Sequence, residues 1–278
     1  MNRTTTLALA LSIGLGAFAQ ELPKASPAAS VEQRIGLTDV SVQYSRPAAR
    51  GRAIFGDLVP YGEVWRTGAN ECTKFTTSGE ITFGGEALEA GTYALFTIPA
   101  ETGWTVIVSH QTNLWGNTGY TEESDVFRTM AMPTASDYDE NFTIAFKNVG
   151  EDRADLVIEW AETSVAIPIE VDVASKSAQN VASALEEAKS SYRNAADFYS
   201  NRGQHEKAIE TIDLALRLDP NNWYTNWVKA EILFRAGKVK DAKTQGTKAI
   251  EMGQEFYDSR GSAFNYRAGL EKEMKDWR

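Results

Sequence analysis

Between Thr38 and Val173, apolar residues mostly alternate with polar ones, and β-branched and aromatic residues are frequent. A period of two is typical of strands that bury one face. The pattern predicts the strands TDVSVQYSR, CTKFTTS, TYALFTIP, WTVIVSH, NFTIAFKNV, ADLVIEW and TSVAIPIEV. No helical pattern interrupts them, which favours an antiparallel β-sandwich of Greek-key or jelly-roll type over a parallel sheet.

Two short signals in this region predict local structure. Gly84-Gly85 separates two strand-like segments and predicts a hairpin. The segment from Leu88 to Tyr93 resembles the corner of a Greek-key sandwich, where a tyrosine hydroxyl bonds back to the backbone. We therefore expect Tyr93 to have a role in the fold.

Near residue 174 the pattern becomes helical and rich in Ala, Glu and Lys. Small residues then recur with a period of 34, in the pairs Ala196 and Ala230, Gly203 and Gly237, Ala208 and Ala242, and Ala215 and Ala249. This spacing resembles the tetratricopeptide helix-turn-helix repeat. It predicts an all-α helical-repeat tail over 174–278, with repeats at about 189–222 and 223–256 and a capping helix over 257–278. The second repeat departs from the pattern, since Gln254 stands where the first has Pro220.

The first helix of each predicted repeat presents polar and aromatic residues on its inward face. Such a face suits an extended peptide or a partner's terminal carboxylate. The candidate peptide-binding residues are Arg193, Asn194, Asp197, Asn201, Tyr224, Trp227, Glu231 and Arg235. The aromatic residues among them equally suit packing against the β-sandwich, and the sequence leaves both alternatives open.

The start of the chain predicts a secretory signal peptide over residues 1–19. Arg3 is followed by an apolar run from Leu7 to Phe18, and Ala17-Phe18-Ala19 offers a cleavage site before Gln20. About twelve apolar residues are too few to span a membrane. We expect a lead segment over 20–37, export to the periplasm or the medium, and no membrane insertion of the mature chain.

Charge and rare residues narrow the classes of function. Residues 1–173 contain 11 basic and 23 acidic residues, a net charge of −12, which disfavours nucleic acid as a partner. The single Cys72 excludes an internal disulfide, and His110 and His205 lie in different halves of the chain. No spacing typical of a metal site or a catalytic triad is present, so we expect no cofactor.

One segment, residues 44–73, departs from the strand pattern: YSRPAARGRAIFGDLVPYGEVWRTGANECT. This arginine-rich segment holds four of the eleven basic residues of the first 173. Guanidinium groups beside aromatic rings suit recognition of a carboxylate, a sulfate or a sugar acid. The candidate ligand-binding residues are Arg46, Arg52, Tyr61, Trp65, Arg66, Asn70 and Glu71, with Trp115 from a later loop.

Two other interpretations of the arginine-rich segment remain open. The arginines at 46, 52 and 66 can instead pair with Asp57, Glu63 and Glu71 in an ionic network that only supports the fold. Alternatively, Glu71 serves as a catalytic carboxylate of an envelope hydrolase acting on glycan or peptidoglycan. Glycoside hydrolysis needs a second carboxyl group roughly 5–10 Å away, which the sequence does not identify.

The same segment resembles the signature of an exported bacterial family known only as a domain of unknown function, GRxIFGxLVPYGxVWRTGANE. The matching pieces are SPAASVEQRIG, YSRP, GRAIFGDLVPYGEVWRTGANE, LEAGTYALFTIP, WTVIV, LWG, FTIAF and LVIEW, within about residues 26–170. The resemblance implies export and a β-rich fold, and it carries no activity. We expect an exported envelope protein that binds or scaffolds: its sandwich recognises a small anionic or sugar ligand or a partner loop, and its tail docks a protein or peptide. These features favour a binding module over an enzyme.

Overall fold

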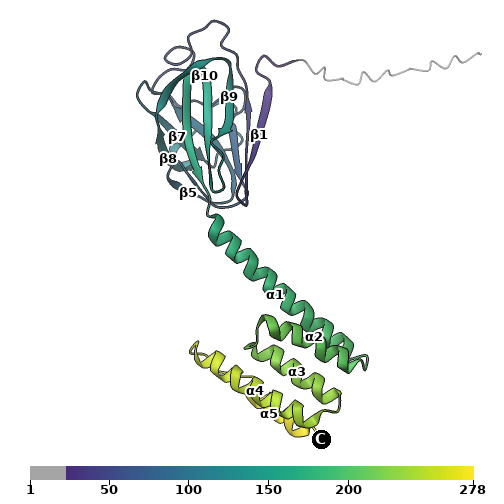
Figure 1. Cartoon of the computed structure of the whole chain (residues 1–278). Helices are drawn as coiled ribbons and strands as arrows, with labels where there is room; N and C mark the ends of the chain where they lie inside the picture. Colours follow the sequence, from purple (N-terminus) through teal and green to yellow (C-terminus); the bar gives the residue numbers. More distant parts are fainter. Residues whose placement is uncertain (1–22) are drawn as a thin grey trace, which may run out of the picture. The chain divides into compact units, whose positions relative to one another are not determined.

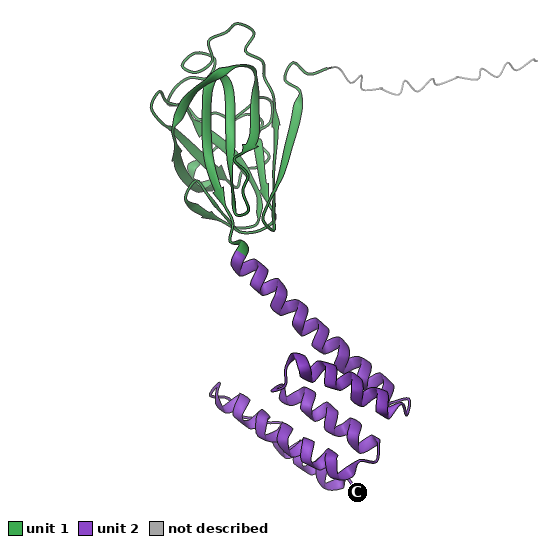
Figure 2. Cartoon of the chain, in the orientation of Figure 1, with its two compact units in different colours: residues 1–173 green, residues 174–278 purple. Residues whose placement is uncertain are grey.

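The computed structural model describes residues 23–278, so the predicted signal peptide lies outside the described residues. The chain divides into two compact units, with the boundary between Val173 and Ala174 (Figure 2). We call the first the β-domain and the second the helical unit. No helix in the described part of the chain is long and apolar enough to cross a membrane.

The β-domain consists of two antiparallel sheets, which confirms the predicted fold class (Figure 1). The first sheet has the order β1 (Ala28–Ile35), β2 (Thr38–Ser45), β3 (Thr73–Thr77), β6 (Gly91–Ile98), β7 (Trp104–Ser109), β8 (Asp125–Ala131). The second has the order β5 (Glu86–Leu88), β4 (Ile81–Phe83), β10 (Arg153–Glu170), β9 (Pro133–Lys147). A short 3₁₀ turn, Glu122–Ser124, precedes β8.

An aromatic cluster lies between the two sheets, and part of it lines the candidate site. Its members are Phe55, Trp65, Trp104, Phe142 and Trp160. The Trp65 and Trp160 rings are stacked at 6.1 Å, and Trp65 meets Phe142 edge-on at 5.2 Å. Such contacts add to the stabilisation from burial alone. Trp65, from the arginine-rich segment, is therefore part of the core.

The Tyr44 hydroxyl connects the two sheets. It donates to the carbonyl of Ile144 at 3.3 Å and accepts from the Ile144 amide at 3.1 Å. Tyr44 is on β2 of the first sheet and Ile144 is on β9 of the second. Because both groups are buried, the bonds satisfy backbone groups that would otherwise be orphaned.

Two local predictions are confirmed. The Gly84-Gly85 turn joins β4 to β5 with Phe83 opposite Glu86, and both glycines have positive φ angles of 58° and 91°. At Gly84 a side chain would also collide with Thr129. The Tyr93 hydroxyl donates to the carbonyl of Glu89 at 3.1 Å, which is the expected tie across the corner.

The strands differ from the prediction in three places. The lead segment over 20–37 contains β1, a full edge strand paired with β2. Its sequence AASVEQRI has few large apolar residues because one face is solvent-exposed. Strand β8 was not predicted, and ADLVIEW and TSVAIPIEV form one strand, β10, that bends at irregular pairing around Ala161. A bulge breaks the period of two without ending a strand.

The helical unit contains α1 (Val173–Ser200), α2 (His205–Leu218), α3 (Trp223–Arg235), α4 (Val239–Asp258) and α5 (Arg267–Asp276). The turns before α2 and α4 each contain a glycine in the left-handed region, Gly203 with φ 73° and Gly237 with φ 74°. The alanines that recur with the period of 34 are fully buried: Ala196, Ala208, Ala215, Ala230, Ala242 and Ala249. Small side chains let helices approach closely where they cross.

The bounds predicted for the capping helix, 257–278, differ from those in the structure. Helix α4 continues to Asp258, and α5 starts only at Arg267. Gly261, with φ 63°, lies in the turn between them. Phe264 then packs over Gly253, where a side chain would collide with the ring. The chain must turn here to bring Phe264 back over α4.

Candidate functional site

The arginine-rich segment links β2 to β3 as a tightly turned loop. Left-handed φ angles occur at Arg50, Gly51, Gly56, Gly62, Thr67, Gly68 and Asn70. The backbone strain is greatest at Thr67, because a β-branched residue rarely adopts φ near 54°. It is fully buried, and the Thr73 hydroxyl donates to its carbonyl at 2.6 Å. Strain of this kind persists only where the surroundings enforce it, and it is frequent at binding sites.

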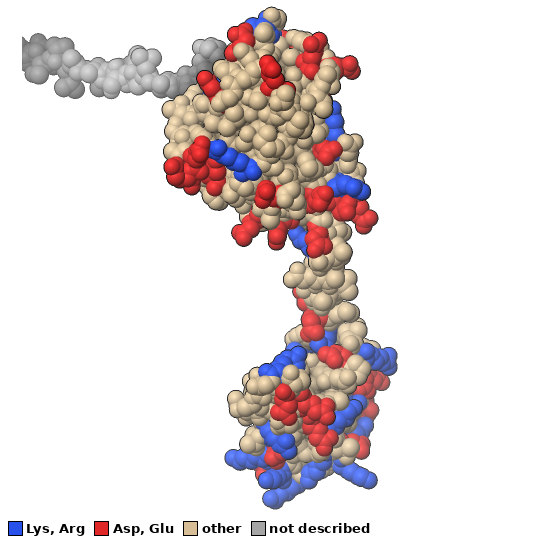
Figure 3. All heavy atoms as spheres, turned by 90° about the vertical axis from the view of Figure 1, so that its left-hand side faces the viewer, with Lys and Arg blue, Asp and Glu red and all other residues tan. Residues whose placement is uncertain are grey.

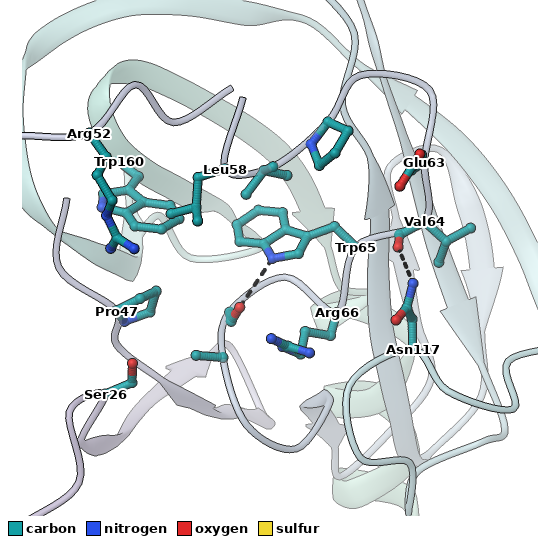
Figure 4. Close-up of a pocket in the computed structure, with 14 residues that line it drawn as sticks. Ser26, Pro47, Arg52, Leu58, Glu63, Val64, Trp65, Arg66, Asn117 and Trp160 are labelled. Atoms are coloured by element: carbon teal, nitrogen blue, oxygen red, sulfur yellow. Dashed lines mark hydrogen bonds between the residues drawn. The ribbon is translucent and has the colours of Figure 1, made fainter. Parts of the chain in front are cut away.

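The segment forms one side of a cleft of about 320 Å³ in the β-domain, which we call the arginine cleft (Figure 4). This volume lies at the lower end of the range for small-molecule sites. The cleft is lined by Ser26, Pro47, Arg52, Leu58, Val59, Pro60, Glu63, Val64, Trp65, Arg66, Gly68, Ala69, Asn117 and Trp160. Most of these side chains are apolar, and the charged ones are two arginines and a single glutamate.

Arg66 is the most unusual group of the cleft. Its Nε is buried and has no hydrogen-bond partner among the described residues. Desolvation lowers the pKa of the guanidinium, which means that the charged form is poorly compensated. No carboxylate of residues 23–278 lies within ion-pair distance of it. A buried donor without a partner costs free energy that a ligand can recover.

The loop from Trp115 to Asn117 lies against the Arg66 guanidinium and is bonded to the arginine-rich segment. The Gly116 amide donates to the Asn70 carbonyl at 2.9 Å, and Asn117 Nδ2 donates to the Val64 carbonyl at 2.6 Å. A Cβ atom at Gly116 would lie 2.5 Å from Arg66 Nη1. A side chain at this position would require the guanidinium to shift, and the φ angle of 70° itself favours glycine.

Arg52 is the second cation of the cleft. Its Nε donates to the carbonyl of Ala49 at 2.9 Å and its Nη2 to the carbonyl of Ala48 at 2.7 Å. These bonds orient the guanidinium without neutralising it. Glu140 lies close enough for Arg52 to contribute to the lowering of its pKa, although the largest cause is the hydrogen bond from the Arg50 amide. No ion pair of Arg52 occurs in the described part of the chain.

The ionic network that the sequence allowed is not formed. Asp57, Glu63 and Glu71 are all exposed, and none makes an ion pair within residues 23–278. Arg46 lies outside the cleft lining, so its assignment as a ligand-binding residue is not supported by its position. Its Nε donates to the Phe142 carbonyl at 3.0 Å and its Nη2 to Thr143 Oγ1 at 2.7 Å. Arg46 ties the segment to β9.

Trp65 and Asn70 have structural contacts at the arginine cleft. Trp65 lines the cleft but is 9% exposed, and its Nε1 donates to the Gly68 carbonyl at 3.1 Å. Asn70 Nδ2 donates to the Ser26 carbonyl and to Ser45 Oγ, both at 3.1 Å. These bonds anchor the chain just before β1.

The remaining ligand-binding candidates lie outside the cleft. Tyr61 is 41% exposed and its ring covers Gly56. Trp115 is 63% exposed and pairs with Glu71 through a backbone bridge. Glu71 lines a separate depression of about 400 Å³ beside Cys72, where it is the only carboxylate.

Trp160 and Asn117 line the cleft but were not among the predicted site residues. Trp160 lies on β10, and Asn117 follows the exposed Trp115 in a loop. Both are far from Arg66 along the chain, and nothing in the local pattern signals their position. Only the tertiary fold brings them to the cleft.

The helical unit brings several peptide-binding candidates of α1 and α3 together. The Arg193 guanidinium lies 5.0 Å from the centre of the Tyr224 ring. Arg235 Nη1 pairs with Asp197 at 2.8 Å and also donates to Asn201 at 3.3 Å. Asn194 is exposed on α1.

Two of the peptide-binding candidates on α3, Trp227 and Glu231, are not fully accessible to a peptide. Trp227 is 4% exposed and stacks on Trp277 at 5.5 Å, so it belongs to the core of the helical unit. Glu231 is partly buried, and burial followed by the charge of Glu273 raises its pKa. The Trp277 ring covers the part of α3 that the sequence predicted to bind a peptide.

Acidic side chains predominate on the β-domain, in keeping with its net charge of −12, whereas both signs are mixed on the helical unit (Figure 3). Within the described residues, no group of three or more His, Cys, Asp or Glu residues is arranged to hold a metal ion. The β-domain is thus an antiparallel two-sheet domain with an arginine-lined cleft.

Residues 26–169 match the family model described as protein of unknown function DUF2911. The chain belongs to this family, and the match includes the arginine-rich segment and every residue that lines the arginine cleft. No curated protein and no solved structure matches the chain.

Proposed function

We propose that the β-domain binds a small anionic ligand in the arginine cleft, with Arg66 as its main anchor. The observation that carries this proposal is that the half-buried Arg66 lines the cleft and makes no ion pair within residues 23–278. Buried charges are usually paired, and a guanidinium matches the geometry of a carboxylate or sulfate. A bound anion would pair with the guanidinium charge.

The surroundings of Arg66 support a small anion rather than a polyanion. Leu58, Trp65 and Trp160 line the cleft beside Arg66, and an ionic interaction is stronger next to such apolar groups than in open water. Outside the cleft the β-domain is acidic, so an extended polyanion would be repelled. The cleft is therefore suited to a ligand that fits inside it.

The helical unit has the features of a protein-docking module of the tetratricopeptide type. The starts of α2 and α4 lie 34 residues apart, as do the matched glycines Gly203 and Gly237. The groups that α1 and α3 bring together, Arg193 with Tyr224 and Asp197 with Arg235, offer both charge signs to a peptide. We place the protein in the cell envelope on the strength of the signal-peptide pattern at residues 1–19.

Hydrolysis is the weaker alternative. Glu71 is the only carboxylate that lines its depression, and Glu63 is the only one that lines the arginine cleft. A glycosidase of the usual kind needs two carboxyl groups that face the same bond. We therefore favour binding over catalysis.

The proposal for the cleft is tested with the mature chain, residues 20–278, and a panel of small carboxylates and sulfate. Thermal shift and native mass spectrometry should show binding that Arg66→Gln abolishes. Arg50→Gln is the matched control, because Arg50 belongs to the same segment but does not line the cleft. Undiminished anion binding by Arg66→Gln would contradict the proposal.

The docking proposal is tested by co-purification from the cell envelope. Partners that bind the face of α1 and α3 should be lost with Arg193→Glu. Arg260→Glu is the control, because Arg260 also stacks on an aromatic ring, Phe256, at another place in the helical unit. Equal recovery of every partner with both variants would argue against docking at this face. N-terminal sequencing of the exported protein should begin at Gln20.

A further inference from the structure

Two cations, and not only Arg66, lie in the arginine cleft. Figure 4 shows the guanidinium groups of Arg52 and Arg66 on opposite sides of the cleft, next to the rings of Trp160 and Trp65. Neither guanidinium has an ion-pair partner in residues 23–278. Arg52 is exposed and lies near Glu140, whereas Arg66 is half-buried, so together the two guanidinium groups offer positive charge to two anionic groups of one ligand.

We infer that the ligand of the arginine cleft is a small organic dianion, a dicarboxylate with a short carbon skeleton. This inference rests on the proposed function and specifies its ligand class. One carboxylate binds the guanidinium of Arg66, which lines the cleft. The other binds the N–H groups of Arg52 that are not used by the Ala48 and Ala49 carbonyls.

The shape of the cleft favours a dicarboxylate over inorganic ions. A volume of about 320 Å³ exceeds what a sulfate or phosphate ion fills, which leaves room for a carbon skeleton between the charges. Leu58, Trp65 and Trp160 provide an apolar wall against which that skeleton packs. One end of such a ligand is held in a fixed position, because backbone carbonyls orient Arg52. The other end meets Arg66, whose guanidinium lies against Gly116.

The remaining charge of the cleft limits the ligand further. Glu63 lines the cleft and makes no ion pair within the described residues, and Figure 4 shows it apart from both guanidinium groups. In a ligand with more than two negative charges, the third charge would lie near the Glu63 carboxylate and be repelled by it. The cleft is thus matched to two negative charges and disfavours three.

The test compares dicarboxylates with monocarboxylates of equal length on the full mature chain. Isothermal titration uses succinate and glutarate as dianions, butyrate and pentanoate as their monoanionic counterparts, and sulfate as an inorganic control. We expect at least one dicarboxylate to bind about 10- to 100-fold more tightly than its counterpart, since each charge-assisted hydrogen bond adds a factor of this size. Arg52→Gln should reduce the dicarboxylate to the affinity of the monocarboxylate, and Arg66→Gln should weaken both.

Two further variants keep the result interpretable. Arg50→Gln removes a nearby charge outside the cleft lining and should leave all affinities within about twofold. Arg52→Lys retains the charge and should keep part of the preference for dicarboxylates, which separates loss of binding from loss of folding. Circular dichroism establishes that each variant is folded.

The outcomes separate this inference from the proposed function. Binding of butyrate or sulfate that depends on Arg66, with no preference for dicarboxylates and no effect of Arg52→Gln, overturns the inference and leaves the proposed function intact. An absence of binding by every probe counts against both. A preference for dicarboxylates that disappears in Arg52→Gln supports both.

Discussion

Replacing Arg66 with methionine should stabilise the β-domain when no anion is present. Methionine retains the apolar stem of the side chain and removes the guanidinium with its unsatisfied Nε. An unsatisfied buried donor costs about 1–3 kcal/mol. Because Arg66 is only partly buried, the low end of this range applies, and we expect a gain of about 1 kcal/mol.

Arg46→Met is the matched comparison, since it removes the same group from the same segment. Its guanidinium has partners, the carbonyl of Phe142 and the hydroxyl of Thr143. Loss of these bonds leaves a buried carbonyl unsatisfied and should cost about 1–3 kcal/mol. The two arginines should thus shift stability in opposite directions.

Urea unfolding of the full chain, with hydrogen exchange at the amides of β9 and β10, measures both effects on the β-domain. At a saturating anion concentration the wild type should become more stable than Arg66→Met, because the anion binds and stabilises only the wild type. A loss of 3–5 kcal/mol in Arg66→Met, on the order expected for breaking a buried ion pair, would refute the reasoning. Arg66 would then have a structural partner, and the binding proposal would lose its main support.

Three other substitutions test the packing and electrostatics. Tyr44→Phe should lower the stability of the β-domain by about 1–3 kcal/mol in urea unfolding, because it leaves the buried Ile144 amide without its acceptor. Ala242→Leu should overpack a helix crossing and cost about 1–3 kcal/mol, so that helical circular dichroism is lost first on heating. Glu231→Gln should be more stable than the wild type at pH 7 and gain little at pH 4. The folded pKa of Glu231 is raised, so the stability that its protonated form provides is lost as the pH rises.

For each of these substitutions, one result would contradict the prediction. An unchanged urea midpoint for Tyr44→Phe would mean that the hydroxyl does not hold the sheets together. Ordinary melting of Ala242→Leu would mean that the crossing has room for a larger side chain. A stability difference for Glu231→Gln that stays constant from pH 4 to pH 7 would mean that the carboxylate is solvated.

The sequence by itself determined the local elements, because periodicity and turn residues act over a few positions. The strands β2, β6 and β7, the Gly84-Gly85 hairpin and the change to helix near residue 174 were all predictable from it. The Tyr93 corner belongs with them, since its hydroxyl reaches only to Glu89. Strand β1 was missed because an exposed edge strand needs few large apolar residues.

Only the tertiary structure decided which of the predicted arginines has a partner. The neighbouring carboxylates of the arginine-rich segment suggested ion pairs, but Glu63 and Glu71 are exposed and make no ion pair within residues 23–278. Arg46 instead reaches β9, and Arg66 lies in a cleft completed by Trp160. These contacts join residues far apart in the chain, and their formation depends on how the two sheets and the connecting loop pack together. For that reason the segment could be recognised from the sequence, whereas its unpaired guanidinium could be found only in the folded domain.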